Sequence, residues 1–394
     1  MRLPRNFAIA LIAAIVSITT LATVLVYDSH RIEHRWTLQV APRPDEGQHL
    51  FAAKGCAQCH GEDATGTQLA PGLRQRASLA SVPRLVTAMW NHAPRMWKDM
   101  QTRQMDYPSL TPEESAQLIA YLYVSGFADS SGNAEHGRRV FEEKRCVSCH
   151  WRRQDTLAAG VDNPLAWTQK LWNHAARMSD RMALDGVPWP QLAGDDVRDL
   201  FAYVSAERRK SQPFSAVNGN PEKGWRVFQE KSCAGCHQLT GHGVGTTFAE
   251  GYQLPPSFAD FGASLLNHMP KMRAALGERH RNLPRFEAQD MADLVVFLYT
   301  LHYLEPGGSP DVGRSVFTWR GCNACHGRNG EGMRGAPSLR GRGKAYTAAR
   351  LASDLWNHGA RMQAQANQAG YGWPTLEDSD VGNLLAFLNT PPER

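Results

Sequence analysis

Cys56-Ala57-Gln58-Cys59-His60 is the first of four pentapeptides in which two cysteines, three positions apart, are followed directly by a histidine. Together the four pentapeptides use all eight cysteines of the 394-residue chain. The other three read Cys146-Val147-Ser148-Cys149-His150, Cys233-Ala234-Gly235-Cys236-His237 and Cys322-Asn323-Ala324-Cys325-His326. Their histidines are 90, 87 and 89 residues apart, and a period this regular indicates a tandem array of similar units.

The residues around each pentapeptide repeat as well. A glycine and a phenylalanine precede the first cysteine by nine and five residues, and an Asn-His-x-x-x-Met segment follows the pentapeptide. Each unit closes with acidic residues and then apolar residues spaced i, i+3, i+4, at residues 112–124, 194–205, 287–301 and 377–389. That spacing is typical of an amphipathic helix, and no stretch alternates with a period of two. We therefore predict an all-α fold.

The pentapeptides predict covalently attached haem. In Cys-x-x-Cys-His the two thiols add to the vinyl groups of one porphyrin, and the histidine binds the iron from the proximal side. A disulfide would leave the histidine unexplained, and a zinc site would need two cysteine pairs at shorter separation. Four copies that use every cysteine also argue against a redox dithiol. We expect four covalently bound haem c groups. The attaching residues would be Cys56, Cys59, Cys146, Cys149, Cys233, Cys236, Cys322 and Cys325, and the proximal ligands His60, His150, His237 and His326.

The composition agrees with small units built around a large cofactor. Only 42% of the residues are hydrophobic, and units of about 88 residues are small for stability from apolar burial alone. A porphyrin would supply the missing core. The 11 Trp, 10 Tyr and 14 Phe exclude a disordered coil. The net charge of +5 lacks the strongly basic footprint of a nucleic-acid-binding protein, so we expect no nucleic-acid partner.

Residues 7–27 are uncharged and mostly apolar, and a helix of that length spans the ~30 Å hydrocarbon core of a bilayer. Arg2 and Arg5 precede the run, which places the N-terminus in the cytoplasm. The alternative is a cleaved signal peptide, whose apolar region is usually ~7–15 residues long and ends at a small-x-small site. We expect residues 1–28 to form an uncleaved transmembrane anchor and residues 29–45 a linker.

Each unit, with its Gly-x3-Phe-x4-Cys-x2-Cys-His start, resembles a class I c-type cytochrome domain. The resemblance implies four tandem haem domains, at residues 46–128, 129–212, 213–306 and 307–394. It implies that the closing helix packs across the first helix. It also implies that a proline carbonyl accepts the Nδ1–H of each proximal histidine and so fixes the tautomer. The candidate prolines are Pro71, Pro164, Pro256 and Pro337.

The resemblance breaks at the distal ligand. Members of that family usually carry a methionine directly before a Pro-x-Leu/Phe step that leads into the last helix. Here the residues before that step are Tyr107, Trp189, Leu283 and Trp373. The Asn-His-x-x-x-Met segment is the expected replacement, because its histidine and methionine share one helical face.

Methionine is the preferred distal ligand, because the later turns of that helix lie nearer the iron in the family's fold. The methionines are Met96, Met178, Met272 and Met362. The alternative is ligation by histidine, at His92, His174, His268 and His358. If methionine binds the iron, these histidines and the neighbouring tryptophan indoles would contact the haem propionates.

Haems closed by two protein ligands favour electron transfer over catalysis, because no coordination position remains for a substrate. We expect a tetrahaem cytochrome that crosses the bacterial inner membrane once and holds its haem domains in the periplasm. It would relay electrons between an inner-membrane or periplasmic donor and a periplasmic or outer-membrane acceptor. It could act as a subunit of a respiratory or photosynthetic complex. The alternative is a haem enzyme with an open distal site in one unit, the third, where Leu266 replaces tryptophan.

Overall fold

The computed structural model describes residues 42–74, 81–152, 156–206, 219–237, 255–301, 308–333, 335–340 and 346–390. Contacts separate residues 1–41 from one compact unit, Pro42–Arg394. The expected anchor, residues 1–28, lies outside the described residues, as does the linker up to residue 41. In the part of the chain that is described, no helix has both the length and the apolar character needed to cross a membrane.

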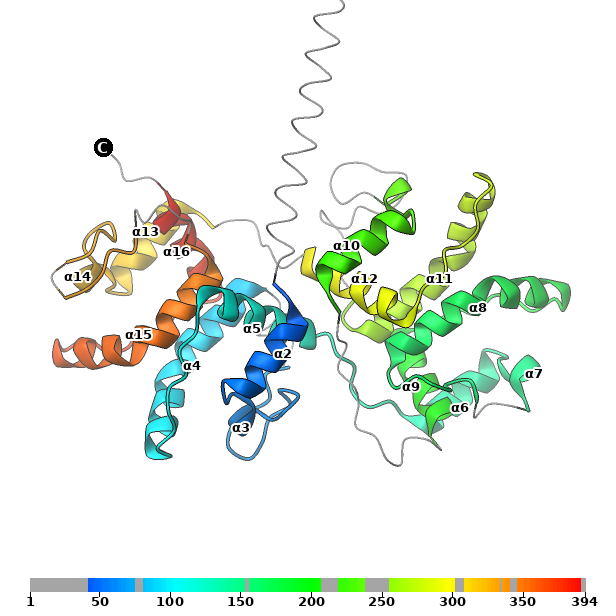
Figure 1. Cartoon of the computed structure of the whole chain (residues 1–394), viewed down its shortest axis with the longest axis horizontal. Helices are drawn as coiled ribbons and strands as arrows, with labels where there is room; N and C mark the ends of the chain where they lie inside the picture. The colour runs from blue at the N-terminus through cyan, green and yellow to red at the C-terminus, as the bar shows by residue number, and fades with distance from the viewer. Residues whose placement is uncertain are drawn as a thin grey trace, which may run out of the picture. The chain divides into compact units, whose positions relative to one another are not determined.

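Every unit contains the same four helical elements in the same order (Figure 1). The first helices are α2 (Pro44–Ala53), α6 (Ala134–Glu143), α10 (Pro221–Glu230) and α13 (Pro310–Trp319). The motif helices are α3 (Ala57–His60), α7 (Val147–His150), η3 (Cys233–Gly235) and α14 (Asn323–His326). The long helices are α4 (Val82–Thr102), α8 (Pro164–Leu184), α11 (Phe258–Gly277) and α15 (Ala348–Gln368). The closing helices are α5 (Pro112–Ser125), α9 (Gly194–Ser205), α12 (Ala288–Thr300) and α16 (Asp380–Asn389).

The described residues form no β-strand. Their only extended pairings are two isolated bridges, Gly66 with Pro71 and Met333 with Ala336. Both bridges close the loop that follows a motif helix, in the first and in the fourth unit. The predicted all-α fold is therefore confirmed for the part of the chain that the structure describes.

The long helix of each unit begins at a residue whose side chain caps it. The capping side chains accept a hydrogen bond from the backbone N–H three residues further on, and they belong to Ser81, Asn163, Ser257 and Thr347. Such a cap satisfies one of the N–H groups that the first helical turn leaves without an intrahelical partner. The start of the long helix is thus set by local sequence, and with it the turn that carries the Asn-His-x-x-x-Met segment.

The first and closing helices of each unit cross at the recurring glycine. A Cβ added to Gly313 would lie 2.0 Å from the carbonyl oxygen of Asn383, so only glycine lets the two backbones approach this closely. One turn later, the Phe317 ring packs against Phe387 with 5.4 Å between centroids. The same close approach occurs at Gly47, Gly137 and Gly224. The crossing predicted from the resemblance is therefore confirmed.

The four units associate as two pairs, the first with the fourth and the second with the third (Figure 1). Helix α15 packs against α4 and α5, and α11 packs against α8 and α9. In the second pair, Ala259 and Ala263 of α11 are buried in one cluster with Phe141 of the second unit. In the first pair, Trp356 of the fourth unit packs against the first unit's buried cluster, which includes Phe51. The first unit therefore packs against the unit farthest from it along the chain, whereas the second unit packs against the next one along the chain.

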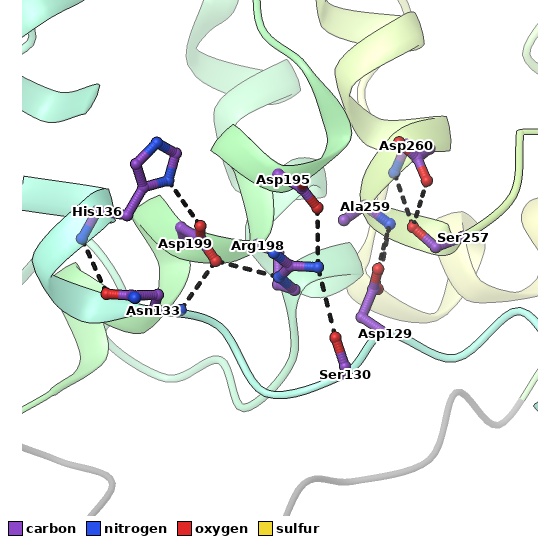
Figure 2. Close-up of polar contacts among 10 residues, drawn as sticks. All are labelled: Asp129, Ser130, Asn133, His136, Asp195, Arg198, Asp199, Ser257, Ala259 and Asp260. Carbon is purple, nitrogen blue, oxygen red and sulfur yellow. Dashed lines mark hydrogen bonds and ion pairs between the residues drawn. The ribbon is translucent and has the colours of Figure 1, made fainter. Parts of the chain in front are cut away.

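The segment between the first and second units is held on the third unit (Figure 2). The carbonyl oxygen of Phe127 accepts from the backbone N–H of Phe258 at 3.1 Å. The Asp129 carboxylate accepts from the N–H of Ala259 at 3.1 and 3.2 Å. A carboxylate at this end of α11 also interacts favourably with the helix dipole. Helices α5 and α12 contact each other nearby, so this segment joins the two pairs.

Candidate functional site

The motif helix places the proximal histidine beside a loop that fixes its ring. His60 Nδ1 lies 3.0 Å from the carbonyl oxygen of Pro71, and His326 Nδ1 lies 3.0 Å from that of Pro337. Because a carbonyl oxygen only accepts, Nδ1 carries the proton and Nε2 keeps its lone pair for a metal. The role predicted for these two prolines is confirmed.

The second unit differs at the corresponding loop. Pro164 is the first residue of α8, and its carbonyl oxygen accepts from the hydroxyl of Thr168 at 2.9 Å. Pro164 therefore serves the start of the helix, which corrects the role predicted for it. The one-residue offset of its Pro-Leu pair was the available signal. In the third unit Pro256 lies just before α11, and residues 238–254 of the preceding loop are outside the described residues.

The cysteines lie at the edge of each unit's core. All eight are described, and none forms a disulfide. Cys56 packs against the buried cluster of the first unit, and Cys146 packs against that of the second. Burial raises the pKa to about 11 for the first thiol of every motif, at Cys56, Cys146, Cys233 and Cys322. An apolar macrocycle attached at these positions would extend the core directly.

A basic residue two positions before each motif ties the motif to the closing helix. In all four units it forms an ion pair with an acidic residue in the first turn of that helix. The pairs are Lys54–Glu114 at 2.8 Å, Lys144–Asp196 at 3.7 Å, Lys231–Asp290 at 3.1 Å and Arg320–Asp380 at 2.9 Å. The sequence interpretation missed this contact, although the basic residue recurs at a fixed spacing.

A second histidine faces the proximal ring in each of the first three units. The ring centroids are 6.4 Å apart for His60 and His92, 6.4 Å for His150 and His174, and 6.3 Å for His237 and His268. A metal bonded to one nitrogen of each ring at about 2.0–2.1 Å would set the centroids about 6.3 Å apart, since each centroid lies about 1.1 Å behind its nitrogen. The two rings of each pair would therefore be able to hold one iron between them.

The remaining distal candidates lie on the same long helices. His358 occupies the equivalent position of α15 and is exposed. The methionines lie one turn beyond the histidines and are all half-buried, at Met96, Met178, Met272 and Met362.

Four of the facing histidines have a lowered pKa, which favours the neutral state. Burial is the main cause that lowers the pKa of His92 below the usual 6.5, and the charge of His60 adds to it. Burial likewise lowers the pKa of His150, His174 and His268. Because the neutral imidazole is the form that binds a metal, these rings need no deprotonation before ligation at neutral pH.

Arg74 gives an independent test of whether haem fits. Its Nε and Nη2 atoms are buried and have no hydrogen-bond partner among the described residues. Buried guanidinium nitrogens without a hydrogen-bond partner are costly, and a haem propionate would remove that cost. Arg74 stands three residues after Pro71, and Arg340 stands three residues after Pro337. The residues present thus fit the group that the motif implies, and the sequence interpretation missed Arg74.

Comparison with known families agrees with this geometry. The model of the cytochrome c family matches residues 44–123, 221–302 and 311–391, which is more than half of the chain. The chain belongs to the cytochrome c family. Membership implies covalently bound haem c and a function in electron transfer. The matched segments are the first, third and fourth units, whereas the second unit, in which Pro164 has moved into α8, lies between them.

The chain is also similar to curated subunits of an oxidase. It is 35% identical over 161 residues to the Cbb3-type cytochrome c oxidase subunit FixP of Rhizobium meliloti (strain 1021). This aligned region covers 38% of this chain and 55% of the relative. It is 36% identical over 101 residues to FixP of Sinorhizobium medicae (strain WSM419), covering 24% of this chain and 35% of the relative. The chain thus spans about a third to just over half of the length of these relatives. No solved structure matches the chain.

In this cytochrome c the two residues that precede His92 contact another unit. Trp90 Nε1 donates to the carbonyl oxygen of Pro374 at 2.8 Å. Asn91 Nδ2 donates to the carbonyl oxygen of Leu376 at 2.8 Å, and Asn91 Oδ1 accepts from the N–H of Leu376 at 2.9 Å. The first unit thereby binds the Pro-x-Leu step of the fourth through three hydrogen bonds.

The other units repeat these bonds reciprocally. The contacts to the Pro-x-Leu/Phe steps are Trp356 to Pro108, Asn357 to Leu110, Trp172 to Pro284, Asn173 to Phe286 and Asn267 to Leu192. We call these side chains, with Trp90 and Asn91 and the backbone they bind, the clasp. The side chain of Leu266 has no N–H to donate, so at these two positions the third unit contributes only the side chain of Asn267. The propionate contact predicted for the tryptophan indoles is wrong, because the indoles bind the paired unit instead.

The clasp also uses two of the residues that replace the family's usual methionine. Trp373 Nε1 donates to the carbonyl oxygen of Trp90 at 3.1 Å, and the two indoles stack at 4.7 Å between centroids. Trp189 Nε1 donates to the carbonyl oxygen of Leu266 at 3.0 Å. The position that usually ligates iron therefore helps to join the units here.

Proposed function

We propose that the chain is a tetrahaem electron carrier in which each unit holds one haem c through its Cys-x-x-Cys-His motif. The observation that carries the proposal is the facing pair of imidazoles, 6.3–6.4 Å apart, in three units. When bound, the haem supplies an iron that alternates between the ferric and ferrous states. The chain attaches the haem through the cysteines, and Pro71 and Pro337 hold the proximal tautomer in two units.

The distal ligands in this proposal are His92, His174, His268 and His358. The ring separation favours histidine over Met96, Met178, Met272 and Met362, which were preferred from the sequence. The clasp gives a second argument, because Asn91 fixes the helical turn beside His92 through two bonds to Leu376. Two imidazole ligands would also give a lower potential than one imidazole and one thioether.

Electron transfer explains this geometry better than substrate chemistry does. An iron held by two imidazoles has no position for a substrate. The third unit was the candidate for an open site, yet the ring centroids of His268 and His237 are 6.3 Å apart, close to the 6.4 Å of the first two units. The Leu266 replacement affects the clasp rather than the distal position. We therefore propose a relay that does not itself catalyse bond chemistry.

The proposed setting is the periplasmic side of a bacterial inner membrane. Residues 7–27 are long and apolar enough to serve as a single anchor, as argued above from the sequence. The similarity to FixP, named as a subunit of a cbb3-type oxidase, supports a place beside a respiratory oxidase. In this setting the units would accept electrons from an inner-membrane or periplasmic donor and pass them to a terminal acceptor.

Separate substitutions at His92 and Met96 test the ligand assignment. We expect His92→Ala to convert one of four low-spin haems to a form that binds carbon monoxide when reduced, while Met96→Ala leaves all four low-spin. The measurements are electron paramagnetic resonance of the oxidised protein and a carbon monoxide titration of the reduced protein. The opposite result would assign Met96 as the ligand. A haem content below four per chain would refute the tetrahaem proposal itself.

A further inference from the structure

The clasp connects the distal side of one haem site to the haem pocket of the paired unit. Asn357 directly precedes the distal candidate His358. Its amide holds both backbone groups of Leu110, at 2.7 Å to the carbonyl oxygen and 2.9 Å from the N–H. Leu110 belongs to the buried cluster of the first unit against which Cys56, a haem-attaching residue, also packs. One peptide bond and one bidentate contact therefore separate His358 from the first unit's haem pocket.

The second pair contains the same connection. Asn267 directly precedes His268, and it binds Leu192 at 2.7 Å to the carbonyl oxygen and 2.8 Å from the N–H. Leu192 packs against the buried cluster of the second unit, as does the haem-attaching Cys146. Two pairs of units that differ in sequence thus place the same amide between a distal histidine and a partner's haem pocket.

The connection also runs in the opposite direction within each pair. Asn91, beside His92, binds the backbone of Leu376, and Asn173, beside His174, binds that of Phe286 at 2.7 and 2.9 Å. Leu376 and Phe286 are both buried, with 4% of their surface exposed. The contact between the two pairs is different, because there the Phe127 and Tyr299 rings meet edge to face at 4.5 Å, away from the asparagines of the clasp.

We propose that the haems exchange electrons in two pairs, first with fourth and second with third, and that the clasp asparagines are the positioning residues for this exchange. The proposal rests on the proposed function, since it needs a haem in each unit. In each step one iron(II) is oxidised as the iron(III) of the paired unit is reduced. No proton moves and no bond is made or broken. Exchange therefore follows the spatial pairing rather than the order of the units along the chain.

The test uses the full-length haem-loaded protein with the first haem marked optically. Cys56→Ala leaves one vinyl group of that haem conjugated with the porphyrin, which moves its absorption to longer wavelength whichever residue is the distal ligand. Flash photoreduction then supplies fewer than one electron per molecule, and the marked band reports arrival of electrons at the first haem. Asn91→Ala with Asn357→Ala removes the asparagine bonds of the clasp in this pair and keeps its three indole bonds, those of Trp90, Trp356 and Trp373. Asn173→Ala with Asn267→Ala is the matched control in the other pair.

We expect the substitutions at Asn91 and Asn357 to slow electron arrival at the marked haem by about tenfold or more, as misplacement by a fraction of an ångström does when geometry sets a rate. The control should change the rate less than about twofold, because sites without shared partners act independently. Redox titration should show unchanged potentials in both variants, so that the driving force is equal. Equal slowing by both variants, or slowing by the control alone, overturns the paired route.

The outcome separates the inference from the proposed function. A missing long-wavelength band in Cys56→Ala would mean that the first unit holds no haem, which refutes both proposals. A band that is present with an unaffected rate refutes only the pairing. If the double variant loses haem, Asn357→Ala alone serves, because it leaves both bonds of Asn91 in place, and the same comparison with Asn267→Ala decides.

Discussion

Trp356→Phe is expected to weaken the pair formed by the first and fourth units. The indole of Trp356 donates to the carbonyl oxygen of Pro108 at 2.6 Å, and its ring packs against the buried cluster of the first unit. Phenylalanine keeps most of the ring packing and removes the N–H. The third unit carries Leu266 at this position, so the fold tolerates the loss of the donor and the variant should still fold.

The structure sets the size of the effect. A typical hydrogen bond contributes about 0.5–1.5 kcal/mol net, and an acceptor left without a partner in a partly buried contact adds to that loss. Pro108 is half-buried, so water compensates in part. We expect the free energy of unfolding of this pair to fall by about 1–2 kcal/mol. For a pair of this size that corresponds to a decrease in Tm of about 2–8 °C.

Thermal unfolding of the haem-loaded protein, followed by near-ultraviolet and Soret circular dichroism, measures this loss. Trp319→Phe is the matched control, because Trp319 lies in the same unit with 81% of its surface exposed. An exposed substitution of this kind should change stability by less than about 0.5 kcal/mol. Equal shifts for the two variants would refute the assignment of the indole bond as a stabilising contact.

Two further substitutions test the crossing helices and the segment between the units. Gly313→Ala should destabilise the fourth unit by about 1–3 kcal/mol, because its Cβ would lie 2.0 Å from the Asn383 carbonyl oxygen. Gly382→Ala is the control in the same unit, because a Cβ added there has no atom within 4 Å, and it should be neutral or stabilising. A urea titration measures both variants, and similar losses of stability for the two would contradict the crossing argument. Burial raises the pKa of Asp129 above 3.8, so its contribution to stability is complete below the unfolded pKa and is lost as the pH rises through the folded pKa. Asp129→Asn should therefore gain stability relative to the wild type as the pH of the urea titration rises from about 4 to 7. A difference in unfolding free energy between the two proteins that does not vary with pH would contradict the raised pKa of Asp129.

Recurrence predicted most of the individual units. The glycine and the phenylalanine that precede each motif lie in the same unit as the amphipathic closing stretch. Together they form the helix crossing that Gly313 and Phe317 illustrate. The hydrogen bond between the proximal histidine and a proline carbonyl was predicted correctly for Pro71 and Pro337. It was not for Pro164, where a shift of one residue moved the proline into a helix. Local spacing thus gave the right result where the spacing recurred without an offset.

The partner of the Trp-Asn dipeptide could not be predicted in this way. Trp90 binds Pro374, which is 284 positions away, and nothing in either segment specifies which of the other units will be its partner. The resemblance placed the indoles beside the propionates, because the earlier turns of this helix lie nearer the propionates in the family's fold. A buried N–H needs an acceptor, and the sequence offers no means to choose between a cofactor and a distant carbonyl. The recurrence of Asn together with a Pro-x-Leu/Phe step was the only available signal, and it gives no pairing.

The sequence alone predicted the four repeats, the cysteines expected to attach haem and the two candidate distal side chains of each repeat. These depend on spacing within a helix or on covalent chemistry, which neighbouring residues determine. The tertiary structure decided which units pair, what Trp189 and Trp373 do at the usual methionine position, and which side chain faces the proximal ring in the first three units. Those outcomes depend on backbone groups that meet only after folding, since a carbonyl freed by one unit's Pro-x-Leu/Phe step accepts its hydrogen bond from another unit.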